Sequence, residues 1–243
     1  MRKLKINKKI IIAIGSLLVI ALIAVSVLYL QGLEIAVLDP KGVIAQKQYE
    51  LLVFTLLLGF IVVIPVFIMA ALIAWRYRED NTKAKYTPDS STNRVAETIW
   101  WGIPIILIVI LSVVTWNSTH NLDPYKSLDA NADSMTIQVV ALDWKWLFIY
   151  PNHDIATVNF VQFPVDTPVH FYLTADAPMN SFWIPQLGGQ IYAMPGMVTE
   201  LNLDATEQGE YKGSSANISG EGFSGMKFIA KASSQNEFDA WVA

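Results

Sequence analysis

The stretch L-L-V-F-T-L-L-L-G-F-I-V-V-I-P-V-F-I-M-A-A-L-I-A-W, residues 51–75, decides the first half of the fold because it contains no charged side chain. A helix needs about 20 consecutive apolar residues to cross a bilayer, and this run is long enough. Pro65 lies inside the run, and a proline is tolerated within a helix that lies in a membrane. The run therefore predicts a transmembrane helix over residues 51–75.

Two other uncharged segments, residues 10–30 and residues 99–116, flank this run. The later segment predicts a second helix and hence a transmembrane hairpin. Two readings fit the earlier one, which follows a basic N-terminus: a secretory signal that is removed, or a helix that is retained. Its length favours retention. Tryptophans stand at the segment ends, where an aromatic belt would lie at the membrane surface: Trp75, Trp100, Trp101 and Trp116.

Positive charge predicts how the hairpin is oriented. Five basic residues precede residue 10 and five lie in residues 76–98, whereas residues 31–50 contain only Lys41 and Lys47. Loops rich in Lys and Arg stay in the cytoplasm. We therefore expect the tail and the loop of residues 76–98 to be cytoplasmic, and everything after Trp116 to lie outside.

The second half of the chain has a different composition. From Asn117 onward there are 14 acidic and 5 basic residues, and a surface of this sign repels the phosphates of nucleic acid. The sequence contains no cysteine, which excludes disulfides, thiolate metal sites and cysteine nucleophiles. His120, His153 and His170 are far apart and show no metal-ligand spacing.

Short β-rich runs separated by turn residues follow residue 134. We predict strands over residues 135–142, 144–150, 156–163, 167–174, 197–203 and 225–232, and a helix that starts near Phe238. Many short strands at this spacing are typical of a β-sandwich or a barrel.

Three motifs are specific enough to point to a family: V-A-E-T-I-W at residues 95–100, D-W-K-W-L-F-I-Y-P at 143–151 and N-I-S-G-E-G-F-S-G-M at 217–226. With the hairpin before them, they resemble subunit II of the haem–copper oxidases, in particular the cytochrome bo-type branch that oxidises quinol. The resemblance implies a membrane-anchored α plus all-β chain with a cupredoxin-like β-sandwich. It also implies a multi-pass protein of a bacterial inner membrane, with the C-terminal domain on the periplasmic side. Its expected parts are residues 1–37, a basic tail and first apolar segment; 38–116, a helical hairpin; and 117–243, the sandwich.

In members of this family that carry binuclear copper, the ligand loop reads C-x-E-x-C-x-x-x-H-x-x-M, and a further His precedes it. The matching positions in this chain are Asn180, Ser215, Asn217, Ser219, Phe223 and Met226. Only Met226 keeps a ligand type. Two thiolates are needed to bridge the metals, and serine hydroxyls are neutral and hard. We therefore expect no metal at these positions, and Met226 to be a buried apolar side chain.

Two further residues have counterparts in the family. The resemblance places Glu97, in the V-A-E-T-I-W motif, at the mouth of a proton-uptake path, although a carboxylate in the first turn of a helix is also favoured by the helix dipole alone. Trp144 matches the tryptophan through which electrons enter copper-bearing relatives. Without copper behind it, we expect Trp144 to serve as an aromatic core or interface anchor.

The resemblance implies a non-catalytic subunit of a proton-pumping oxidase that transfers electrons from ubiquinol to O2. Haems and copper would lie in a partner, subunit I, with further small membrane subunits and lipid around it and no cofactor on this chain. A cytochrome c oxidase subunit II is excluded because there is no cysteine. The alternative from another class is a membrane-anchored β-domain scaffold or sensor with no respiratory role, which would not copurify with haem.

Overall fold

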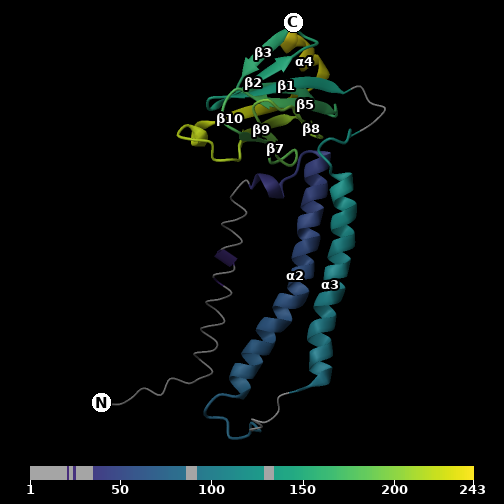
Figure 1. The fold of residues 1–243 in the computed structure, drawn as a ribbon, viewed down its shortest axis with the longest axis vertical. Helices are drawn as coiled ribbons and strands as arrows, with labels where there is room; N and C mark the ends of the chain where they lie inside the picture. Colours follow the sequence, from purple (N-terminus) through teal and green to yellow (C-terminus); the bar gives the residue numbers. More distant parts are fainter. Residues whose placement is uncertain (1–20, 22–23, 26–34, 86–91, 129–133) are drawn as a thin grey trace, which may run out of the picture. The chain divides into compact units, whose positions relative to one another are not determined.

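The computed structural model describes residues 21, 24–25, 35–85, 92–128 and 134–243 (Figure 1). The chain divides into two units, Met1–Asp39 and Pro40–Ala243. In the first unit, a 3-10 turn, η1, spans Ala36–Leu38. The predicted first apolar segment, residues 10–30, lies almost entirely outside the described residues, so both of its readings remain predictions.

Two long helices begin the second unit and run side by side (Figure 1): α2, Val43–Arg76, and α3, Arg94–Asn121. Their most apolar windows have mean hydropathies of 3.1 and 2.3, and none of either window is buried inside the chain. At a rise of about 1.5 Å per residue, 34 and 28 residues give lengths of about 51 and 42 Å. Both exceed a hydrocarbon core of about 30 Å, which confirms two helices able to cross a membrane.

The first turn of α2 is fixed by groups from the β domain. The first N–H groups of a helix have no partner within the helix. The Val43 N–H donates to Asp204 Oδ1 at 2.9 Å, and the Ala45 N–H donates to the Leu187 carbonyl at 3.1 Å. Burial raises the pKa of the Asp204 carboxyl, and the bond from Val43 partly offsets that rise. Asp204 therefore caps α2 from a position 161 residues away in sequence.

The β domain is a sandwich of two five-stranded sheets with strand orders β3-β2-β1-β5-β8 and β4-β10-β9-β6-β7. Strand pairing is antiparallel except for β1 with β5 and β4 with β10. The strands are β1 Met135–Leu142, β2 Lys145–Tyr150, β3 Ile155–Val158, β4 Phe160–Pro164, β5 Val169–Ala175, β6 Asn180–Trp183, β7 Ile191–Ala193, β8 Thr199–Leu203, β9 Gly209–Ser215 and β10 Lys227–Ser233. A final helix, α4, spans Gln235–Val242.

Aromatic side chains from both sheets fill the core. Phe182 of β6 stacks on Phe228 of β10 at a ring-centroid distance of 5.0 Å and an interplanar angle of 12°. Trp146 and Phe148 of β2 pack against this pair with tilted or edge contacts. All four side chains are at most 2% exposed. Such offset and edge contacts stabilise beyond the apolar area they bury, so this cluster joins the sheets under the loops of the candidate site.

The strand predictions were right in kind but wrong in several details. Residues 156–163 form parts of two strands because Asn159, at φ 57°, turns the chain from one sheet to the other. The Asn159 side chain accepts the Trp146 N–H at 2.8 Å, which holds this turn. Trp144 belongs to a turn, also at positive φ, and β2 begins one residue later. Strands β6, β7 and β9 were missed, while the helix predicted near Phe238 is confirmed as α4.

Candidate functional site

The loop with copper-site spacing connects β9 to β10. These strands pair antiparallel up to Ser214 and Lys227, so the intervening residues project beyond the paired strands. A short 3-10 turn, η2, spans Phe223–Gly225 and is followed by Met226. The Ser215 N–H donates to the Met226 carbonyl at 3.0 Å and closes the loop at its base.

Three of the six predicted positions share one hydrogen-bond network. The Ser215 hydroxyl donates to Asn180 Oδ1 at 2.9 Å, and Asn180 Nδ2 donates to the Pro178 carbonyl at 2.8 Å. Asn217 Nδ2 donates to the Met179 carbonyl at 3.2 Å. Asn180 is 1% exposed and Ser215 is 6% exposed. The polar side chains at these positions therefore satisfy one another and fasten the loop to the start of β6.

The other three positions lie around this network. Met226 is fully buried in the core, as expected for an apolar side chain. Ser219 is half-buried, and its hydroxyl oxygen is buried without a hydrogen-bond partner among the described residues. Phe223 begins η2, where its N–H donates to the Gly220 carbonyl at 3.3 Å and its side chain is half-buried.

The donor set does not fit a binuclear copper centre. Copper of this kind needs thiolates and imidazoles, whereas the loop offers two hydroxyls, two amides, a phenyl ring and one thioether. The three histidines are engaged separately, His120 with Trp116, His153 with Phe238 and His170 with Glu200. Within the described ranges, no group of three His, Cys, Asp or Glu could hold a metal ion.

Trp144 covers the loop. A Cβ placed on Gly222 would lie 2.3 Å from Trp144 Cδ2, so the indole packs directly on that glycine. Gly220, at φ 140°, lies beneath the same ring. Trp144 is itself at φ 53°, a strained backbone for a bulky residue that costs about 1–3 kcal/mol and must be held by its surroundings. The contact between Trp144 and this loop was not predicted from the sequence. The closely spaced glycines 220 and 222 were the signal for it, because a glycine allows a ring to approach the backbone closely.

Glu97 lies elsewhere, in the first turn of α3. The Asn93 side chain caps this helix by accepting the Ala96 N–H at 3.2 Å. The Glu97 N–H donates to the Asn93 carbonyl at 2.9 Å, and its side chain is half-buried. The structure thus places Glu97 where the helix dipole favours a negative charge, and no described contact joins it to the β9–β10 loop.

Comparison with known proteins identifies the relatives of this chain. Residues 154–233 match the family model described as cytochrome C oxidase subunit II, periplasmic domain. Cytochrome bo(3) ubiquinol oxidase subunit 2 of Pseudomonas putida is 55% identical over 216 residues, which are 89% of this chain and 69% of the relative. Quinol oxidase subunit 2 of Bacillus cereus is 39% identical over 238 residues, 97% of this chain and 80% of the relative.

A solved structure, the periplasmic domain of subunit II of cytochrome oxidase from Bradyrhizobium japonicum, is 21% identical. It covers 49% of this chain and 94% of that domain with a TM-score of 0.44. Ubiquinol oxidase subunit 2 of Acetobacter aceti is 50% identical over 219 residues, which are 89% of this chain and 71% of the relative. The chain belongs to the ubiquinol oxidase subunit 2 family.

Proposed function

We propose that this chain is the non-catalytic subunit II of a terminal oxidase that takes electrons from ubiquinol, reduces O2 to water and pumps protons. The loop between β9 and β10 is the observation that carries the proposal. It keeps the spacing of a copper site, yet Ser215 and Asn180 bond to each other in place of a metal. Electrons therefore have no entry through this loop, which favours a membrane-soluble donor over cytochrome c.

The chain's own part in such a complex is structural. Haems, copper and the quinol site are expected in subunit I, because this chain contains only three histidines and no cysteine. The apolar side chains of α2 and α3 are exposed within this chain and would pack against subunit I, smaller membrane subunits and lipid. We place residues 117–243, which contain the last turn of α3 and the β domain, in the periplasm, with residues 38–116 as the anchor and residues 1–37 as tail and first segment.

Oxygen uptake by the complex, purified through a tag on this chain, tests the proposal. We expect uptake with ubiquinol as the donor and none with reduced cytochrome c, and we expect haem in the preparation. Uptake with cytochrome c alone would contradict the proposed donor. A preparation with neither haem nor uptake would instead favour the membrane-anchored scaffold or sensor.

We also propose that Glu97 collects protons for a path into subunit I. An ionisable group at the membrane boundary can collect protons and pass them to a hydrated path. Glu97→Gln removes the exchangeable charge and keeps the side-chain shape. We expect ubiquinol-driven oxygen uptake to fall on the order of tenfold, below the range for groups that protonate a reacting atom directly.

Two controls separate proton uptake from assembly. Glu79→Gln changes an exposed carboxylate in the loop between the same two helices and should leave the rate unchanged. Glu97→Asp keeps an ionisable group and should retain most of the rate. An unchanged rate for Glu97→Gln, with normal haem content, would show that this carboxylate only stabilises the start of α3.

A further inference from the structure

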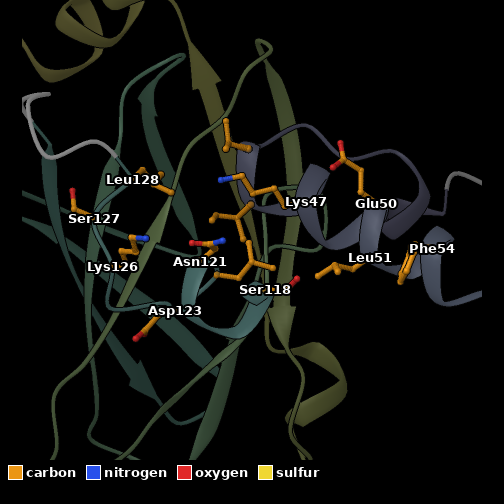
Figure 2. Close-up of a pocket in the computed structure, with 13 residues that line it drawn as sticks. Lys47, Glu50, Leu51, Phe54, Ser118, Asn121, Asp123, Lys126, Ser127 and Leu128 are labelled. Carbon is orange, nitrogen blue, oxygen red and sulfur yellow. The ribbon is translucent and has the colours of Figure 1, made fainter. Parts of the chain in front are cut away.

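A pocket of about 470 Å³ lies where the first turns of α2 meet the end of α3 and the segment that follows it (Figure 2). Its lining includes charged or polar side chains, among them Lys47, Asn121 and Lys126, and apolar ones such as Leu51 and Leu122. The site therefore combines a polar mouth with an apolar wall, and none of its residues belongs to the loop between β9 and β10.

The polar part of the pocket suits an anion. Figure 2 shows the amines of Lys47 and Lys126 and the amide of Asn121 directed toward the middle of the pocket. Among the residues that the structure describes, neither lysine forms a salt bridge, and Lys47 acts on the Asp204 carboxyl only at longer range. Two acidic residues also line the pocket and hold local hydrogen bonds: Glu50 accepts from Gln46 at 3.1 Å, and Asp123 accepts the Tyr125 N–H at 3.0 Å.

An apolar groove continues from this pocket between the helices. A second cavity of about 250 Å³ shares Leu51, Ser118 and Leu122 with the first and extends to Leu111 and Val114. The cavity is also lined by threonine and serine hydroxyls. A hydroxyl that donates to its own helix needs no other partner, so an acyl chain can lie against it; the Thr119 hydroxyl donates to the Thr115 carbonyl at 2.7 Å in this way. The two cavities thus form a path from charged to apolar surroundings.

The depth of the two cavities matches the layers of a bilayer. Lys47 precedes the uncharged run that starts at Leu51 by four residues, which is about 6 Å along a helix. Lysines at this level extend toward the headgroups, while the residues beyond Leu51 lie among acyl chains. The charged end of the path is therefore at headgroup level in the leaflet next to the β domain.

We propose that this path binds one glycerophospholipid, with its phosphate at Lys47, Asn121 and Lys126 and one acyl chain along the groove between α2 and α3. The lysine pair favours a phosphate over the neutral headgroup of a quinol, which offers the two ammonium groups no negative charge. This inference rests on the membrane insertion proposed above, but it does not depend on the electron donor. Such a lipid would fill the gap between the two helices beside the junction with the β domain.

Native mass spectrometry of the delipidated full chain in detergent, titrated with dioleoyl phosphatidylglycerol, tests the site. We expect one tightly bound lipid, and a loss of affinity on the order of tenfold in Lys47→Gln/Lys126→Gln. Dioleoylglycerol lacks the phosphate. Its affinity for the parent chain should be as low as the affinity of dioleoyl phosphatidylglycerol for Lys47→Gln/Lys126→Gln. The matched control, Lys145→Gln/Lys212→Gln, changes two exposed lysines of the β domain. It should bind dioleoyl phosphatidylglycerol with the affinity of the parent chain.

Competing ligands and a second variant make the result decisive. Val114→Trp fills the apolar groove and leaves both lysines, so it should also weaken binding even if the lysine variant folds poorly. Equal binding by parent and lysine variant would overturn the proposal, as would preferential binding of ubiquinol. Displacement by inorganic phosphate at equal concentration would assign the pocket to a free anion. Oxygen uptake is measured separately, so failure here leaves the proposed oxidase role intact.

Discussion

A variant of this chain with the copper ligands of its copper-bearing relatives introduced at the matching positions is expected to bind copper and become coloured. The substitutions are Asn180→His, Ser215→Cys, Asn217→Glu, Ser219→Cys and Phe223→His. The Ser215 oxygen lies 2.9 Å from Asn180 Oδ1, so a thiolate and an imidazole at these positions start side by side. Met226 is already in place, and the buried hydroxyl of Ser219 has no described partner to lose. Thiolate and imidazole ligands are those that this type of copper requires.

Copper content and visible absorption of the full chain in detergent measure the outcome. The matched control is Asn180→His/Asn217→Glu/Phe223→His, which carries the same changes except for the two cysteines. We expect about two coppers per chain and a thiolate absorption band only in the variant with cysteines. A variant that keeps its β-sheet circular dichroism and still binds no copper would show that the loop is wrongly aligned with the copper-bearing relatives.

The sequence was most informative where the pattern is local. The uncharged runs identified both helices, and alternating residues gave strand β1 with the bounds seen in the structure. The beginning of α2 was missed because residues 43–50 contain Gln46, Lys47 and Glu50, which break the apolar run but suit headgroup level. Strand β9, G-E-Y-K-G-S-S, was missed because its register comes from pairing with β10 and not from its own apolar residues.

The site could be predicted only in part for a similar reason. Motif spacing predicted six positions, Asn180 on β6 and five in or beside the loop between β9 and β10, but not the bond between Ser215 and Asn180, which are 35 residues apart. The closely spaced Gly220 and Gly222 indicate a close approach, but no local pattern shows that Trp144 is the ring that rests on them, since this contact depends on how two turns meet. Long-range contacts of this kind follow from the packing of the sheets, and periodicity along the chain does not encode them.

Gly42→Ala is expected to loosen the attachment of the helical hairpin to the β domain. A Cβ at Gly42 would lie 2.5 Å from the Asp204 carbonyl oxygen and 2.8 Å from that of Leu187. Both are backbone atoms, so a side-chain rotation cannot relieve the clash. The φ of Gly42 is −135°, which any residue adopts, so the effect is purely steric. Overpacking of this kind costs about 1–3 kcal/mol, and a valine at the same position should cost more.

The clash matters because the same segments hold the start of α2. If Asp204 and Leu187 move away, the N–H groups of Val43 and Ala45 lose their acceptors together, so the steric cost and the lost cap add. Asp204→Ala removes only the cap and should destabilise by about 0.5–2 kcal/mol, the range for other helix caps. We expect thermal unfolding of the chain in detergent to follow the order Asp204→Ala, then Gly42→Ala, then Gly42→Val as the least stable.

The matched control is Gly59→Ala in the same helix, where an added Cβ meets nothing within 4 Å and alanine is the better helix former. It should unfold at or above the temperature of the parent chain. Because the junction sets how the β domain is held next to the membrane helices, the yield of haem-containing complex should fall in step with stability for the Gly42 variants and not for Gly59→Ala. A Gly42→Val chain that unfolds and assembles like the parent would mean that Leu187 and Asp204 do not clamp α2.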